Sequence, residues 1–208
     1  MSLVVLKLGG SLLSCRDIAD RLRQFFAGLK SARVLIVVGG GGSADVVREW
    51  SQRFDLTEEA GHWIALRSLS VTRALVKTLI PGLGEVTSRD EALRFWKDQQ
   101  SPLLLDIESS LSQSESQGAI TLPHTWDTTS DSIAAWVAQE WDASELILLK
   151  SVDLPEVATL DVACAAELVD ANFPQVAKQI PHVRWCNLTA KTPQIVRWLR
   201  HGVPDEFE

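Results

Sequence analysis

Two stretches of the chain, VLKLGG at residues 5–10 and LIVVGGGGS at residues 35–43, decide the fold class. In each of them a short apolar run ends directly in glycines, and a segment with helical periodicity follows. Buried parallel strands are continuous apolar runs of this kind, and helices connect them. The two stretches therefore predict an α/β fold with a largely parallel central sheet.

The same pattern continues along the chain. Short apolar runs begin at Leu3, Arg33, Pro102, Glu145 and Val183. Helical periodicity separates them, in residues 16–27, 44–54, 58–79, 88–98, 131–141 and 193–201. The polar, serine-rich segment that begins at residue 108 predicts a solvated loop or a flap. We expect a single domain over residues 1–208.

Composition and charge exclude several classes of protein. The 208 residues are 46% hydrophobic and 23% charged, as in soluble globular proteins. A net charge of -7 argues against a surface for nucleic acid. The three cysteines lack the spacing of a zinc site, and no apolar run approaches the roughly 20 residues of a membrane span. We expect a cytoplasmic protein with neither a nucleic-acid partner nor a membrane.

Both glycine turns predict phosphate sites. Lys7 precedes Gly9, Gly10 and Ser11, and the second turn holds four consecutive glycines, Gly39, Gly40, Gly41 and Gly42. Glycines between a strand and a helix let the backbone approach an anion, with free amides and the helix dipole directed at it. The alternative for either turn alone is that its glycines only make a tight connection.

Two well-known nucleotide motifs are excluded at the second turn. The run GGGGSADV has no Lys-Ser/Thr pair at its end, so it is not a Walker A loop. Gly39, Gly41 and Ala44 fit G-x-G-x-x-A, but a predicted helix stands where that motif requires a second strand ending in an acidic residue. A dinucleotide-dependent enzyme is disfavoured, and only NAD binding that no nucleoside triphosphate competes would support it.

The segment TWDTTSDSIAAW at residues 125–136 carries hydroxyls and carboxylates just before an apolar helix. Thr129 or Ser130 is suited to cap that helix, and Asp131 then lies in its first turn, where negative charge is favourable. A phosphoryl transferase would use the same carboxylate to orient lysines around the moving group. Both interpretations of Asp131 stay open.

The predicted helix over residues 58–79 supplies candidates for an acceptor site. Its apolar stripe contains Ala60, Trp63, Ile64, Val71, Ala74, Leu75 and Thr78. Arg67 falls on that stripe, so we expect it to bind a phosphate, to pair with a buried carboxylate or to extend outwards to solvent. His62 and His124 are interpreted as satisfied histidines, with donation to a phosphate as the alternative, and Trp126 as a core residue or a stacking surface for a flat ring.

Three segments together resemble a known family. VLKLGGSLL, VVGGGGSADVVREW and TSDSIAAWVA are similar, in order and spacing, to the best-marked segments of the amino acid kinase family. Over residues 3–202 the chain is most similar to the small subgroup that phosphorylates an aminomethylfuran phosphate to its diphosphate in methanofuran synthesis. The resemblance implies a three-layer αβα sandwich, an acceptor over the N-terminal half, ATP over the C-terminal half, and a homodimer.

The resemblance also implies roles for individual residues. Lys7 would stabilise the transferring phosphoryl group, Asp131 would organise the lysines, Lys178 would be the second catalytic lysine, and Mg2+ would be bound to the ATP phosphates. Gly9, Gly10, Gly40 and Gly41 would supply amide donors. From the residues themselves we add Ser11, Gly42, Arg67, Thr129 and Ser130 to the phosphate- and substrate-binding set.

One segment departs from the family. At LLKSVDLP, residues 148–155, Lys150, Ser151 and Leu154 replace three residues of a Thr-Asp-Val-Asp-Gly run. Loss of the glycine disfavours a positive φ, while a lysine adds a phosphate contact. We assign Lys150, Ser151 and Asp153 to the nucleotide side. The alternatives to a kinase of a small phosphate are a kinase of an amino acid carboxylate and a non-catalytic relative that binds nucleotide or phosphate.

Overall fold

The computed structural model describes residues 2–29, 32–118, 122–156 and 158–204 and contains one sheet. Its strands are β1 (Leu3–Leu8), β2 (Arg33–Val38), β3 (Gly84–Val86), β4 (Leu103–Leu105), β5 (Glu145–Lys150), β6 (His182–Asn187), β7 (Ile195–Arg200) and β8 (Val203–Pro204). Their order is β3-β4-β2-β1-β5-β6-β7-β8, parallel from β3 to β6 and antiparallel for β7 and β8. The predicted α/β class with a largely parallel sheet is confirmed.

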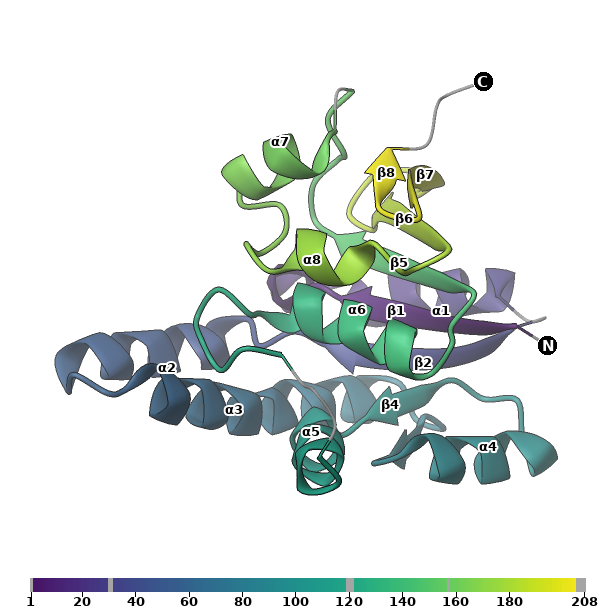
Figure 1. The fold of residues 1–208 in the computed structure, drawn as a ribbon. Coiled ribbons are helices and arrows are strands. Elements are labelled where there is room, and N and C mark those ends of the chain that lie inside the picture. The colour runs from purple at the N-terminus through teal and green to yellow at the C-terminus, as the bar shows by residue number, and fades with distance from the viewer. Residues whose placement is uncertain (1, 30–31, 119–121, 157, 205–208) are drawn as a thin grey trace.

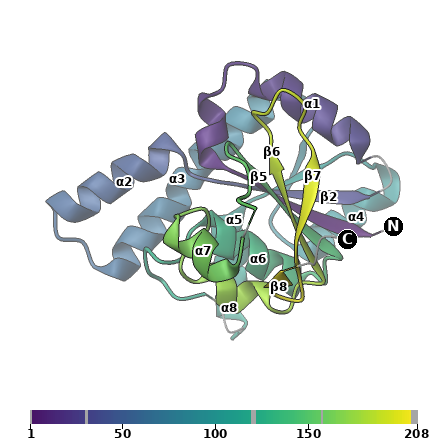
Figure 2. The same ribbon diagram turned by 90° about the horizontal axis from the view of Figure 1, so that it is seen from above.

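Helices cover both faces of this sheet. They are the 3-10 helix η1 (Gly10–Ser14) and the α-helices α1 (Ile18–Gly28), α2 (Gly42–Arg53), α3 (Glu58–Leu79), α4 (Arg89–Asp98), α5 (Ile107–Ser116), α6 (Ser130–Glu140), α7 (Leu160–Ala165) and α8 (Phe173–Ala177). Figures 1 and 2 show α1 and α6 on opposite faces of the central strands, which makes the three-layer sandwich. Within the described ranges, no helix is long and apolar enough to cross a membrane.

The central strands are buried on both sides and supply two cores. Successive side chains of a strand point to opposite faces. Val5 of β1 and Leu148 of β5 therefore pack in the core beneath α6, whereas Leu6 and Ile147 pack in the core beneath α1. Lys7 is two residues after Val5 on the same strand, so its side chain points to the same face of the sheet as that of Val5, towards α6. The alternation of side chains along β1 therefore decides on which face of the sheet the Lys7 ammonium lies.

Helix α6 lies against the middle of the sheet because its sequence is small and apolar. It buries every residue from Asp131 to Ala138, including Ala134, Ala135 and Ala138. Alanine side chains allow the helix backbone to approach the strands closely. Thr129 caps the helix by accepting a hydrogen bond from the Asp131 amide at 3.4 Å. The N-terminus of α6 is thereby fixed beside the carboxyl ends of β1 and β5.

Two sequence predictions of secondary structure are wrong. The segment predicted as a solvated loop from Glu108 forms α5, which Asp106 caps and which buries Ile107 and Leu111, one turn apart. The segment predicted as a helix over residues 193–201 forms strand β7, which pairs with β6 and buries Trp198. In both places tertiary packing outweighed the local pattern.

The predicted inward face of α3 is also wrong. Its buried residues are Gly61, His62, Leu66, Leu69, Thr72 and Val76. Val71 and Leu75, which the sequence placed inside, are 63% and 42% exposed. Arg67 points to solvent with a side chain 68% exposed and pairs with Glu108 of α5 at 2.9 Å. The helix is rotated relative to the prediction because it packs along α2 as well as over the sheet.

The carboxyl ends of β1 and β2 meet through glycine backbone. A Cβ atom built on Gly10 would lie 2.2 Å from the Gly41 nitrogen, and one built on Gly39 would lie 2.8 Å from the Gly10 nitrogen. Gly41 has φ +50, and its Cβ would lie 2.8 Å from the Gly10 carbonyl oxygen. Side chains would force the two turns apart, so the close approach of the turns requires glycine.

We expect Gly41→Ala to lower the free energy of unfolding by about 1–3 kcal/mol, because alanine is strained at this φ and would contact Gly10. Urea denaturation followed by tryptophan fluorescence measures the change. The matched control is Gly42→Ala in the same turn, where a Cβ would meet nothing within 4 Å and stability should be maintained. Equal stability of the two variants would contradict the packing of the turns described above.

Candidate active site

Three ionised side chains meet at the carboxyl ends of β1 and β5. The ammonium nitrogen of Lys7 lies 3.0 Å from Oδ1 of Asp131. That of Lys150 lies 2.8 Å from the same oxygen and 2.9 Å from Oδ2. Lys7 and Asp131 are each only 5% exposed. Two lysines on neighbouring parallel strands thus share one carboxylate at the start of α6.

The electrostatics of this cluster follow from burial and mutual charge. Burial opposes ionisation of Asp131, but the charges of Lys7 and Lys150 outweigh it and hold the pKa of the carboxyl below its usual value. For Lys150, burial and the charge of Lys7 lower the pKa to about 8, against the opposing effect of Asp131. Lys150 is therefore a cation at neutral pH that loses its proton readily above it.

A second carboxylate, Asp170, holds the start of α6 in place. It accepts hydrogen bonds from the Thr129 amide at 3.0 Å, the Thr129 hydroxyl at 2.8 Å, and the Ser132 amide at 3.0 Å, as well as from the Ser132 hydroxyl. It also accepts one from the amide of Phe173, at 3.0 Å. Sequence reasoning missed Asp170, because its partners at the start of α6 lie about forty residues earlier in the chain.

The glycine turns border the same cluster. The Gly9 amide donates to the Leu149 carbonyl of β5 at 2.9 Å, which ties the first turn to the strand that carries Lys150. The second turn opens α2, and no side chain caps that helix. Uncapped amides at a helix N-terminus favour an anion. Ser130 lies next to this turn, with its hydroxyl 3.0 Å from where a Cβ of Gly39 would be.

In the C-terminal half, the segment after β5 is tied to two neighbours. The Ser151 hydroxyl lies 3.0 Å from that of Ser11, and the Ser151 carbonyl accepts from the Thr189 hydroxyl at 3.1 Å. Asp153 accepts a hydrogen bond from the side-chain amide of Asn187 at 3.0 Å. Ser151 thus joins the first glycine turn, whereas Asp153 pairs with the end of β6.

Lys178, predicted as the second catalytic lysine, is not brought to this cluster. It follows α8 with an exposed side chain, and its ammonium donates to Gln175 at 3.1 Å. Lys150 occupies the position beside Asp131 instead. Arg67 is likewise directed away from the site, towards Glu108. The sequence signal for Lys150 was the departure at LLKSVDLP, but its pairing with Asp131 depends on strand register.

A pocket lies beside the second glycine turn, between α2, α3 and the loop before α6. It encloses a cavity of about 70 Å³ that opens to solvent, so a bound ligand would extend into the open mouth. Its apolar lining consists of Ala44, Ala65, Leu66, Leu69 and Ile133, and Gly40, Thr128, Thr129 and Ser130 border it. The pocket and the lysine cluster share the start of α6.

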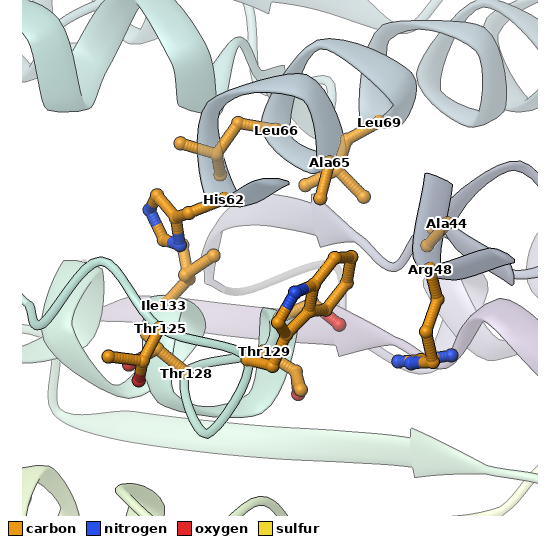
Figure 3. Close-up of a pocket in the computed structure, with 13 residues that line it drawn as sticks. Ala44, Arg48, His62, Ala65, Leu66, Leu69, Thr125, Thr128, Thr129 and Ile133 are labelled. Atoms are coloured by element: carbon orange, nitrogen blue, oxygen red, sulfur yellow. The ribbon is translucent and has the colours of Figure 1, made fainter. Parts of the chain in front are cut away.

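Arg48 supplies the pocket with a cation that sequence reasoning missed. Figure 3 shows its side chain reaching from α2 along the pocket. Its guanidinium lies 5.2 Å from the ring centre of Trp126 and pairs with Asp45 at 2.9 Å. An arginine held over an indole is pre-positioned for an anion. Among the residues with described positions, no group of three or more His, Cys, Asp or Glu could hold a metal ion.

We expect Asp131→Asn to destabilise the fold by about 3–5 kcal/mol, because two ammonium groups would stay buried without their carboxylate. Urea unfolding at pH 7 measures the change. Adding Lys150→Met should recover part of the loss by removing one of the unpaired charges. Asp20→Asn, which breaks an exposed pair with Arg23 on α1, is the control and should cost under about 1 kcal/mol. Similar stability of the two single variants would disprove the shared ion pair.

Known proteins are similar to this chain in sequence and in fold. The model of the amino acid kinase family matches residues 2–101. A curated relative, the (5-(aminomethyl)furan-3-yl)methyl phosphate kinase of Methanocaldococcus jannaschii, is 24% identical over 189 residues, which cover 84% of this chain and 82% of the relative. The resemblance predicted from the sequence is confirmed.

Solved structures share the fold. UMP kinase from Bacillus anthracis superposes with a TM-score of 0.62 at 10% identity, covering 94% of this chain and 98% of that one. UMP kinase from Ureaplasma parvum gives 0.61 at 15% identity, covering 88% of each chain. Uridylate kinase from Archaeoglobus fulgidus gives 0.54 at 24% identity, covering 74% of this chain but only 64% of that one. The three structures support the fold assignment.

Proposed function

From its likeness to the amino acid kinase family, we propose that this chain is an ATP-dependent phosphotransferase acting on a small phosphorylated acceptor. The name of the curated relative supports (5-(aminomethyl)furan-3-yl)methyl phosphate as that acceptor, in the synthesis of a methanofuran-type cofactor. The observation that carries the proposal is the cluster of Lys7, Asp131 and Lys150 beside two glycine turns. Cations and free amides around one point suit the transfer of a phosphoryl group.

In the proposed reaction, an oxygen of the acceptor phosphate attacks the γ-phosphorus of ATP. The new P–O bond forms as the bond to the β,γ-bridging oxygen breaks, and ADP leaves with the electron pair. Lys7 and Lys150 would stabilise the charge on the oxygens of the moving group. Asp131 would act as a positioning residue, because its ion pairs fix both ammonium groups.

The two substrates would approach from different sides. The pocket beside Gly40 would hold the acceptor, with Arg48 on its phosphate. ATP would lie over the C-terminal half, beyond Lys150 and Ser151, and Mg2+ would be bound mainly by the ATP phosphates. Ser130, between these sides, would donate a hydrogen bond to a phosphate oxygen, whereas the amide and the hydroxyl of Thr129 both donate to Asp170.

A non-catalytic phosphate-binding relative is the second candidate, motivated by the altered segment at Lys150. The pairing of Lys150 with Asp131 favours the kinase, because the altered residue adds a cation to the cluster. We also propose a cytoplasmic homodimer. Its support is the exposed apolar stripe of Val46 and Trp50 on α2 and Phe54 directly after it, at successive intervals of four residues.

We expect release of ADP that requires both Mg2+ and an acceptor from a panel of small phosphates, including the aminomethylfuran phosphate. Lys7→Met should lower kcat about 100-fold or more, because a charge-stabilising group is lost. Lys178→Ala, at the exposed lysine outside the cluster, should keep its activity. Unchanged turnover in Lys7→Met would refute the kinase. Calorimetric binding of MgATP without reaction of any acceptor would support the non-catalytic alternative.

The lowered pKa of Lys150 predicts a pH dependence. As pH rises through about 8, the free enzyme loses the Lys150 proton and one of its two cations. We therefore expect kcat/KM, which reports ionisations of the free enzyme, to fall about tenfold per pH unit above this value. An arginine stays charged over this pH range, so Lys150→Arg should show no such decline, even if its highest value of kcat/KM is lower than that of the wild-type protein. The same decline in both proteins would assign it to another group.

A further inference from the structure

The pocket has two ends of opposite character. Figure 3 shows Arg48, from α2, and His62, from α3, at opposite ends, with Leu66 and Ala65 on one side and Thr125 and Thr128 on the other. The Arg48 end is cationic and adjoins the second glycine turn. The His62 end has no cationic side chain of lysine or arginine in the pocket lining. A ligand that fills the pocket meets two different environments.

At the second end of the pocket, His62 stacks on His124, and two carboxylates lie close to His124. The rings of His62 and His124 are stacked, with centroids 4.8 Å apart and an interplanar angle of 15°. Nε2 of His124 lies 2.7 Å from Oε1 of Glu115, and its Nδ1 lies 4.0 Å from Oε1 of Glu59. Two carboxylates, one from α5 and one from α3, therefore lie beside His124 and outnumber the single positive charge that its ring can carry. None of these three side chains lines the pocket, so they act on it from behind His62.

His62 itself is suited to accept a hydrogen bond. It is 5% exposed, and burial, followed by the charge of His124, lowers its pKa, so the ring is neutral at pH 7. One of its ring nitrogens is hydrogen-bonded to the backbone of Thr125. A neutral imidazole that donates from one nitrogen has an acceptor lone pair on the other. Because His62 lines the pocket, it can accept a hydrogen bond from a donor held there.

We propose that this end is an amine subsite for a protonated amino group on the acceptor, with His62 as its hydrogen-bond partner in the pocket lining and Glu115, behind His124, as a more distant negative charge. The acceptor would then be a compact aminoalkyl aryl or heteroaryl phosphate, with its ring against Leu66 and Trp126 and its phosphate towards Arg48. An ammonium donates to the neutral His62 and is attracted by the carboxylates beyond it. This inference rests on the proposed function, and it adds the residues that select the amine.

The experiment compares two ligands that differ only in the amine. They are (5-(aminomethyl)furan-3-yl)methyl phosphate and (5-methylfuran-3-yl)methyl phosphate, with binding measured by calorimetry without ATP. We expect the wild-type protein to bind the amine at least about tenfold more tightly, as for a charged hydrogen bond made in a partly buried site. Equal affinity for the two would overturn the subsite.

Variants identify the residues responsible. Glu115→Gln, at a side chain 26% exposed, and His62→Gln should each reduce the preference for the amine to about threefold or less. Glu108→Gln, also on α5 but paired with Arg67, is the matched control and should keep the full preference. Arg48→Ala should weaken the binding of both ligands by the same factor and leave the ratio of their dissociation constants unchanged. An unchanged ratio in both Glu115→Gln and His62→Gln would overturn the assignment.

Binding and turnover separate the two proposals. If the amine is preferred in binding but neither ligand yields ADP with MgATP, the amine subsite stands and the proposed phosphoryl transfer fails. If both ligands yield ADP and bind equally well, the transfer stands and the amine subsite fails.

Discussion

One carboxylate, Asp131, lies between two ammonium groups that the sheet brings together. Lys7 and Lys150 stand at the ends of neighbouring parallel strands and point to the same face, so strand register alone places two positive charges side by side. Burial would make this arrangement unstable without a counterion. The position of α6, its cap at Thr129 and the hydrogen bonds to Asp170 all serve to hold Asp131 at that point.

Much of this arrangement is readable from local sequence signals. Apolar runs that end in glycines predicted the central strands and the two glycine turns, because burial on both faces removes polar residues from parallel strands. Lys7 was notable as a cation in such a run, and Asp131 as a carboxylate at a helix start. A departure from the family pattern likewise drew attention to Lys150. Each of these signals can be recognised from the few residues on either side of it in the sequence.

The features that sequence reasoning missed depend on distant contacts. The buried face of α3 is set by α2 and the sheet together, so the periodicity of α3 alone gave the wrong face and an inward Arg67. Strand β7 exists because it can pair with β6. The choice of Lys178 followed family spacing, whereas Lys150 reaches Asp131 through the register of β5 on β1. Arg48 has no local mark, since its neighbour Trp126 comes from a loop after α5.

The contact between Gly10 and Gly41 limits which positions of this protein can accept other residue types. At this contact peptide groups pack on peptide groups, so a side chain at Gly10, Gly39 or Gly41 would force the two turns apart. The neighbouring pocket is bordered in part by side chains that belong to neither turn, including Arg48 on α2 and His62 on α3. Replacing these side chains would change which ligand the pocket favours and leave the backbone contact of the turns as it is.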